Sequence, residues 1–183
     1  MENKAKDIVK DHEYFLFDCD GVLWTNGEII PGTIEFIKHL VSEGKKVFFV
    51  TNNSTKSRKV IFEHAKNLGI ADVEGISIEQ FYPTGYLSAL YCKETLKSKK
   101  VFVIGLEGIE TELTNMGIET VTIPKHMIEN SRVSDEDFEK MQVDPSIDTV
   151  VSGYYPYWTY NVLCYSSLLI RGKWHFELFS SAF

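Results

Sequence analysis

Two aspartates one residue apart, Asp18 and Asp20, are the side chains of this 183-residue chain best placed to do chemistry. They follow the apolar residues 15–17 and precede Gly21, the pattern of a buried parallel strand that ends in a loop. Residues i and i+2 of a strand point to the same face, so both carboxylates start out on one side. Open α/β sheets bind ligands at the carboxyl ends of their strands. The pair therefore predicts a polar site where the first strand ends.

Two neighbouring ionised acids repel each other. Carboxylates spaced this closely therefore need either a bound cation or different protonation states. Magnesium would neutralise one acid as a hard oxygen ligand and leave the other to carry a proton. The chemistry that suits such a pair is phosphoryl transfer, with one aspartate as nucleophile and the other as acid and base. A calcium loop or a plain turn is the alternative, but the apolar Val22, Leu23 and Trp24 add no oxygen ligand.

A second polar stretch, Thr51–Ser54, follows the predicted strand 46–50, whose residues 47–50 are apolar. The spacing of apolar residues predicts a helix over residues 33–44 between this strand and the first. A strand-helix-strand unit returns the second strand parallel to the first, so Thr51–Ser54 is expected beside Asp18. Hydroxyl and amide groups at a strand end, leading into the next helix, suit the oxygens of a phosphate. An ordinary turn or helix cap is the alternative for these residue types.

Residues 18–24 read Asp-Cys-Asp-Gly-Val-Leu-Trp. They resemble the first motif of the haloacid-dehalogenase-type (HAD) phosphatases, in the version typical of phosphoglycolate and 4-nitrophenyl phosphate phosphatases. Thr51–Ser54 resembles the second motif of the same family. The resemblance implies magnesium-dependent hydrolysis of a small phosphate monoester, such as 2-phosphoglycolate or 4-nitrophenyl phosphate, through an aspartyl-phosphate intermediate.

The resemblance also implies a role for each site residue. Asp18 would attack phosphorus, and Asp20 would protonate the leaving oxygen and then deprotonate water. Thr51, Asn52 and Asn53 would bind the phosphoryl oxygens. The expected cofactor, Mg²⁺, would sit on the Asp18 carboxylate and the Asp20 backbone carbonyl.

The expected fold class is α/β, because strands and helices alternate along the chain. Further strands are predicted near residues 101–104, 120–123 and 148–153. By resemblance, residues 1–84 are the N-terminal part of a Rossmann-like HAD core that is incomplete here. Residues 85–183 would be the α/β cap domain that this type of phosphatase inserts into its core.

Two further predictions concern the proposed cap. Leu87, Leu90 and Tyr91 recur at helical spacing, which predicts that they form the core-facing stripe of a helix. Residues 124–147 are polar and charged, and they predict a solvated face or a loop. The aromatic residues of 154–160 are expected at an interface, where a homodimer would form through the cap; packing inward or lining the substrate entrance is the alternative.

The chain departs from the family pattern in two places. The lysine of the third motif and the acid pair of the fourth are missing, and residues 173–183 do not resemble the family's continuation. A truncated chain or a gene-model error is the expectation, and this chain alone is expected to be inactive. The family's Gly-aromatic-Asp-x-His pattern reads Gly153-Tyr154-Tyr155 here, so the substrate-binding histidine is not expected. A catalytically incompetent binding or regulatory module is the alternative function.

Composition excludes several other classes of protein. The net charge of −7 and the scattered basic residues exclude a general nucleic-acid-binding surface. No apolar run approaches the roughly 20 residues that span a bilayer, and the N-terminus lacks a signal core, so we expect no membrane partner and a cytoplasmic location. The three cysteines form no disulfide or zinc pattern. Cys19, between the two acids, is expected to be a small buried strand residue rather than a redox switch. The expected partner is a small phosphorylated metabolite.

Overall fold

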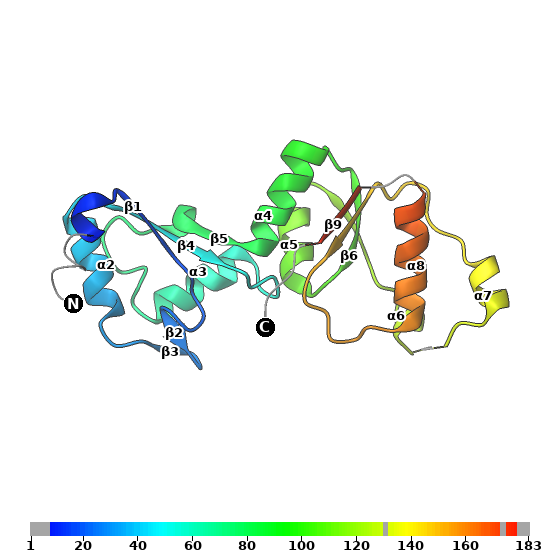
Figure 1. Ribbon diagram of the computed structural model, residues 1–183, viewed down its shortest axis with the longest axis horizontal. Helices are drawn as coiled ribbons and strands as arrows, with labels where there is room; N and C mark the ends of the chain where they lie inside the picture. The colour runs from blue at the N-terminus through cyan, green and yellow to red at the C-terminus, as the bar shows by residue number, and fades with distance from the viewer. Residues whose placement is uncertain (1–7, 130–131, 173–174, 179–183) are drawn as a thin grey trace. The chain divides into compact units, whose positions relative to one another are not determined.

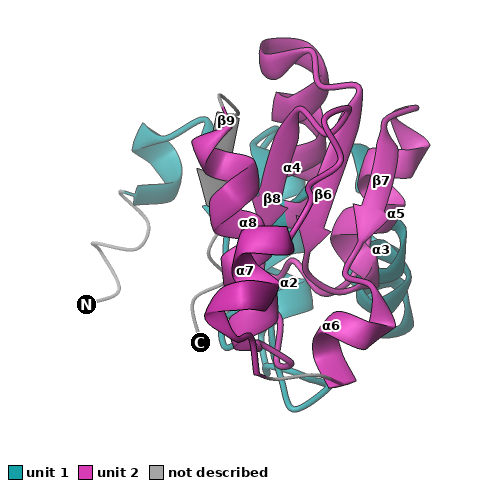
Figure 2. Cartoon of the chain, turned by 90° about the vertical axis from the view of Figure 1, so that its right-hand side faces the viewer, with its two compact units in different colours: residues 1–52, 58–84 teal, residues 53–57, 85–183 magenta. Residues whose placement is uncertain are grey.

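Two parallel sheets and one small hairpin organise the chain in the computed structural model. The described residues are 8–129, 132–172 and 175–178. The chain divides into two compact units, coloured separately in Figure 2. The first unit comprises residues 1–52 and 58–84, and the second comprises residues 53–57 and 85–183. The short connection 53–57 therefore belongs to the second unit, although it lies between two segments of the first.

The first unit has three parallel strands, a hairpin and two covering helices (Figure 1). Its elements are β1 (Tyr14–Phe17), β2 (Trp24–Thr25), β3 (Glu28–Ile29), α2 (Thr33–Ser42), β4 (Lys46–Thr51), α3 (Arg58–Asn67), the 3-10 helix η1 (Ile78–Gln80) and β5 (Phe81–Pro83).

The sheet of the first unit has the order β1-β4-β5, and both pairings are parallel. Phe17 of β1 pairs with Phe49 of β4, and Thr51 of β4 pairs with Pro83 of β5. The strand-helix-strand prediction is confirmed, because α2 connects two parallel neighbours. All three carboxyl ends consequently meet at one edge of this sheet. β1 lies at one side of the sheet, and its Leu16 is 66% exposed.

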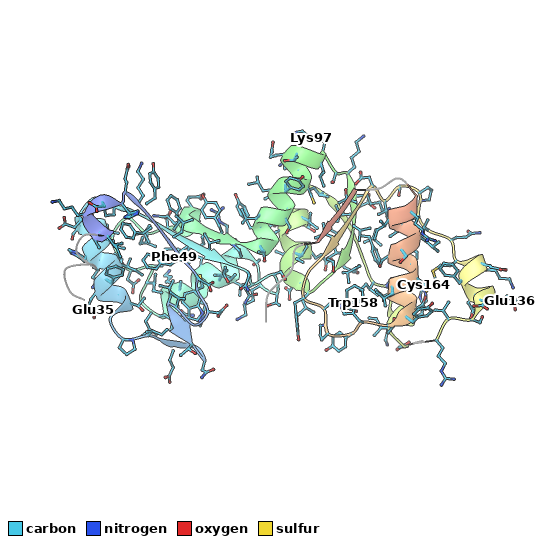
Figure 3. The ribbon with its side chains drawn as sticks, in the orientation of Figure 1. Glu35, Phe49, Lys97, Glu136, Trp158 and Cys164 are labelled. Atoms are coloured by element: carbon cyan, nitrogen blue, oxygen red, sulfur yellow. The ribbon has the colours of Figure 1, made fainter. Side chains whose placement is uncertain are left out.

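The core of the first unit forms where α2 and α3 pack on the sheet. Phe49 and Phe81 are fully buried on neighbouring strands, and their rings stack with centroids 4.4 Å apart. Ile37 and Leu40 of α2 contribute from the helix side and are also fully buried. Figure 3 labels Phe49 within this unit. Truncating such a buried phenylalanine to alanine typically costs about 3–5 kcal/mol, so this cluster holds the strand ends in place.

The hairpin β2–β3 turns tightly at residues 26 and 27, between its two short strands. Trp24 pairs with Ile29 in an antiparallel ladder. The two turn residues, Asn26 and Gly27, have φ of 51° and 81°. Both values lie in the left-handed region, which two-residue hairpin turns require and which asparagine and glycine adopt most readily.

The second unit has a four-stranded parallel sheet with helices on both faces. Its elements are α4 (Thr84–Tyr91), the π-helical turn η2 (Cys92–Leu96), β6 (Lys100–Ile104), α5 (Glu107–Asn115), β7 (Glu119–Thr122), α6 (Lys125–Glu129), α7 (Asp135–Lys140), β8 (Thr149–Ser152), α8 (Tyr160–Arg171) and β9 (His175–Leu178). The strand order is β7-β6-β8-β9.

The central strand β6 separates two apolar clusters, because alternate side chains of a strand point to opposite faces. Phe102 and Ile104 pack with residues of α6 and α8. Val101 and Val103 pack instead with residues of α4 and α5. All four side chains are buried, as expected for a parallel sheet covered on both faces.

The buried face of α4 differs from the prediction. Gly85, Ser88 and Ala89 are its buried residues. Leu87 and Leu90 are half-buried, and Tyr91 is 37% exposed. Small side chains let the helix approach its neighbours closely. The buried face of α4 is therefore the one with the smallest residues, and not the one with the most apolar residues.

Several elements, among them α6, α7 and β9, were not predicted from the sequence as regular structure. Residues 125–129 and 135–140 form the short helices α6 and α7, and α7 has no buried residue, consistent with a solvated face. β9 adds a fourth strand parallel to β8. Among the described residues, no helix is both long and apolar enough to cross a membrane.

Candidate active site

Asp18 and Asp20 lie in the loop that follows β1. Asp18 is the first residue after the strand, and its Oδ1 accepts a 2.8 Å hydrogen bond from the N–H of Cys19. The Oδ1 of Asp20 accepts a 2.9 Å hydrogen bond from the indole Nε1–H of Trp24. Both aspartates are exposed. Each carboxylate is therefore oriented through one of its oxygens, while solvent reaches the side chain.

The loop between the two acids and Trp24 closes on itself through backbone hydrogen bonds. The N–H of Leu23 donates to the carbonyl of Cys19 over 2.9 Å, and the N–H of Gly21 donates to the carbonyl of Trp24 over 2.7 Å. Gly21 has φ of 81°, a conformation that glycine adopts without steric cost. A Cβ added there would meet nothing within 4 Å. The backbone angle, rather than a lack of space, is the reason for glycine.

Thr51 and Asn52 end the neighbouring strand β4. Because Phe17 pairs with Phe49 in a parallel register, the chain leaves β1 and β4 at the same edge of the sheet. Thr51 is buried, with 2% of its surface exposed. The carbonyl of Asn52 accepts a 2.9 Å hydrogen bond from the Oγ1–H of Thr84, which follows β5. The first unit thus gathers Asp18, Asp20, Thr51 and Asn52 at the carboxyl ends of adjacent strands.

Thr84 is a residue that the sequence analysis missed. Its hydroxyl holds the carbonyl of the peptide that follows Asn52, so it supports the candidate phosphate-binding stretch from a third strand end. The signal that could have found it is its position directly after residues 81–83, which form β5 beside β4.

Asn53 belongs to the second unit, unlike the other predicted site residues. Its side-chain Oδ1 accepts hydrogen bonds from the N–H of Thr55 (2.9 Å) and from the Oγ1–H of Thr55 (2.8 Å). This Asx turn shapes the connection toward α3. The side-chain oxygen of Asn53 therefore stabilises this turn.

The rest of the segment 53–57 is anchored within the second unit. Ser54 is 1% exposed, and its Oγ accepts a 3.3 Å hydrogen bond from the N–H of Tyr154, which follows β8. The carbonyl of Thr55 accepts a 3.2 Å hydrogen bond from the N–H of Gly108 in α5. Two distant parts of the second unit therefore hold the residues that come directly after Asn52.

Two glycines permit this anchoring because the backbones approach so closely. A Cβ at Gly108 would lie 2.6 Å from the nitrogen of Lys56 and 2.7 Å from the carbonyl oxygen of Ser54. A Cβ at Gly153 would lie 2.7 Å from the Oγ of Ser54 and 2.5 Å from a methyl carbon of Ile109. These separations are shorter than van der Waals contact, so a larger residue at either position would displace its neighbours.

Cys19, between the two acids, is a packed core group. Its side chain is fully buried. Burial, reinforced by the negative charges of Asp18 and Asp20, raises the pKa of the Cys19 thiol to about 12. The reactive thiolate is therefore scarce at neutral pH, which disfavours a redox switch. Cys19 is buried as predicted, but it lies in the loop after β1 and not in the strand.

The donor set at the β1 loop fits magnesium chemically. Magnesium prefers oxygen ligands, retains several waters and commonly takes one or two carboxylates together with substrate phosphate oxygens. The carboxylate of Asp18 and the backbone carbonyl of Asp20 are donors of this kind. Within the described part of the chain, no group of three or more His, Cys, Asp or Glu side chains is placed to hold a metal ion. A cation at this loop would thus depend on water and phosphate oxygens in addition to these residues.

Comparison with known proteins identifies the family that this chain resembles. A family model described as haloacid dehalogenase-like hydrolase matches residues 15–119. A 4-nitrophenylphosphatase of Schizosaccharomyces pombe is 41% identical over 162 residues, which are 87% of this chain and 53% of that protein. The chloroplastic phosphoglycolate phosphatase 1A of Arabidopsis thaliana is 35% identical over 176 residues, which are 93% of this chain and 46% of that protein.

The fold comparison agrees with the sequence comparison. The crystal structure of a hypothetical protein from Pyrococcus horikoshii superposes with a TM-score of 0.70 at 31% identity, covering 92% of this chain and 58% of that one. The chain spans about half the length of the curated relatives that it matches.

Proposed function

This chain belongs to the haloacid dehalogenase-like hydrolases, and from that premise we propose that it supplies the nucleophile and the acid–base of a magnesium-dependent phosphatase acting on small phosphate monoesters. Substrates of the 2-phosphoglycolate or 4-nitrophenyl phosphate type are proposed from the names of its relatives. The observation that carries the proposal is the pair Asp18 and Asp20 at the end of β1, beside Thr51 and Asn52 at the end of β4.

In the first step Asp18 attacks phosphorus. Its Oδ1 is held by the N–H of Cys19, so Oδ2 is the oxygen that forms the new bond to phosphorus. The bond between phosphorus and the leaving oxygen breaks, and Asp20 gives its proton to that oxygen. The products of the step are an alcohol, an aspartyl phosphate at position 18 and an ionised Asp20.

In the second step water attacks phosphorus of the aspartyl phosphate. Asp20 takes the proton of this water, the bond between phosphorus and Asp18 breaks, and inorganic phosphate leaves. Both aspartates return to their starting protonation states. The division of roles is the one that the family resemblance implies. It is supported by the position of Asp18 directly after the strand and by the hydrogen bond from Trp24 to Asp20.

The phosphoryl oxygens are bound by Thr51 and Asn52. A hydroxyl, an amide and the backbone N–H groups of this turn match the acceptor oxygens of a phosphate. Thr84 holds the carbonyl of the peptide that follows Asn52.

When bound, magnesium supplies positive charge that offsets the charge of the phosphoryl group and of the nucleophile. The Asp18 carboxylate and the Asp20 carbonyl would hold it. In keeping with this assignment, the first unit, residues 1–52 and 58–84, serves as the catalytic core. The second unit, which includes the connection 53–57, serves as the cap.

The test is hydrolysis of 4-nitrophenyl phosphate by the natural full-length protein, with and without Mg²⁺. Asp18→Asn is expected to lower kcat by at least about a thousandfold, because an amide cannot be the nucleophile. Asp72→Asn, which alters another exposed carboxylate of the same unit, is the matched control and should keep activity. An Asp18→Asn protein that retains a tenth of the activity would refute the assignment.

A non-catalytic binding module is the second candidate. It is favoured by the lack of a third metal-ligating side chain within the described residues. Such a protein would bind phosphate or its analogue vanadate, and lose that binding in Thr51→Val, yet release no product from any phosphate monoester. Turnover that requires Asp18 would exclude it.

A further inference from the structure

The indole of Trp24 reaches back to the second aspartate of the loop. Its Nε1–H donates a 2.9 Å hydrogen bond to Oδ1 of Asp20, four residues earlier in the chain. The side chain of Asp20 is thus tied to a ring whose position is set by the protein core. A tryptophan N–H is a donor and never an acceptor, so this contact fixes which oxygen of Asp20 accepts.

Trp24 itself is held on several sides. It is 5% exposed and belongs to the hydrophobic core of the first unit. The ring of His64 from α3 packs edge-on against it with centroids 5.1 Å apart. Its backbone carbonyl accepts from Gly21 and its backbone N–H donates to Cys19. The indole N–H is therefore aimed at Asp20 before any ligand arrives.

The hydrogen bond is not needed to close the loop. The loop is already closed by backbone bonds from the N–H groups of Gly21, Leu23 and Trp24, and Asp20 is exposed. An exposed aspartate usually keeps several rotamers, and immobilising one costs conformational entropy. A fixed donor at this distance therefore selects an orientation of the carboxylate.

We propose that Trp24 is a positioning residue for Asp20: its N–H occupies Oδ1 and so leaves Oδ2 to carry and deliver the transferred proton. The inference rests on the proposed acid–base role of Asp20. His64 contributes indirectly, because its ring packs against the indole and supports it. The assignment concerns the proton transfers by Asp20 in both steps, and it gives Trp24 no direct role in holding the nucleophile Asp18.

The test replaces the indole N–H alone. In the full-length protein, 3-benzothienylalanine at position 24 puts sulfur where Trp24 has N–H and keeps the ring shape. For an alkyl phosphate, whose leaving oxygen needs a proton, kcat should fall roughly tenfold to a hundredfold, the effect of one hydrogen bond to a charged group. For 4-nitrophenyl phosphate, a good leaving group, kcat should fall by less than about threefold. Equal losses for both substrates would overturn the proposal.

A double-mutant cycle supplies the control. In an Asp20→Asn background, the analogue at position 24 should cause no further loss with the alkyl phosphate, because its only functional partner is already gone. Additive losses would show that Trp24 acts through something other than Asp20, and would also overturn the proposal. Trp24→Phe, which lacks the N–H as well, should reproduce the substrate split if it folds.

One measurement is independent of activity, so it separates failure of this inference from failure of the proposed function. The indole N–H signal of Trp24 in a ¹H–¹⁵N NMR spectrum should shift when Asp20 becomes asparagine and stay nearly unchanged when Asp18 becomes asparagine. An indole N–H chemical shift that is unchanged by Asp20→Asn would refute the positioning role, regardless of the activity measured. A shift together with absent phosphatase activity in the wild type would instead reject the proposed function while the contact stands.

Discussion

Replacing Gly108 by alanine should destabilise the second unit, although alanine normally favours a helix. Gly108 is the second residue of α5. A Cβ at this position would lie 2.6 Å from the nitrogen and 2.7 Å from the carbonyl carbon of Lys56, and 2.7 Å from the carbonyl oxygen of Ser54. All three atoms belong to backbone, which cannot rotate aside as a side chain does.

The magnitude follows from two opposing effects. Gly→Ala in a helix stabilises by up to about 1 kcal/mol. Forcing an extra methyl group into closely packed structure typically costs about 1–3 kcal/mol. The hydrogen bond from the Gly108 N–H to the Thr55 carbonyl, 3.2 Å long, would also lengthen. We therefore expect a net loss of about 1–2 kcal/mol in the free energy of unfolding.

Gly85→Ala is the matched control. Gly85 is also the second residue of a helix, α4, but the closest atom to an added Cβ is 3.7 Å away, an ordinary contact. This variant should be neutral or stabilised by up to about 1 kcal/mol. The assay is urea unfolding followed by circular dichroism, with hydrogen exchange of the amide at position 108 as the local probe. Equal stabilities for the two variants would refute the close approach of 53–57 to α5.

Three other predictions concern separate features of the chain. Hydrogen bonds from Ser146 and the nearby Lys100 lower the pKa of Asp144 to about 2. Asp144 therefore stabilises the fold above its ordinary pKa of 3.8 and loses that contribution as pH falls from about 4 to 2. The difference in stability between wild type and Asp144→Asn in urea titrations should close over that interval, and a difference independent of pH would contradict this. Lys97 has φ of 57° where η2 ends, so Lys97→Gly should raise the free energy of unfolding by about 1 kcal/mol, and an unchanged or lower urea midpoint would argue against strain there. The homodimer that we propose to form through the second unit should dissociate at least about tenfold more readily in Trp158→Ala, since Trp158 is 44% exposed; sedimentation showing only monomer at every concentration would reject it.

The strands that carry the candidate site were predictable because each is an apolar run with a polar end. The apolar runs 15–17 and 47–50 lie in β1 and β4, which pair in parallel. The turn at Asn26 and Gly27 was predictable for a local reason, since few other residues accept its positive φ values. Patterns of this kind depend on near neighbours in the chain, which a single sequence displays directly.

The features that were missed depend on partners far away in the chain. The hydrogen bond between Tyr154 and Ser54 joins residues a hundred positions apart, and no local pattern indicates it. The buried face of α4 is set by the small Ser88 and Ala89, because the space between elements, rather than apolar character, selects it. The contact between Trp24 and Asp20 is local, but the direction of a side chain was needed to see it.

The anchored connection 53–57 limits how this protein can be taken apart. The chain passes between its two units after residues 52, 57 and 84, so a cut at residue 85 does not separate them cleanly. A fragment of residues 85–183 would leave the N–H groups of Gly108 and Tyr154 without the partners that they have here. A chimera that takes its second unit from another protein would set foreign residues against Ser54 and Lys56. Exchange of this unit between relatives therefore requires that the connection after β4 be exchanged with it.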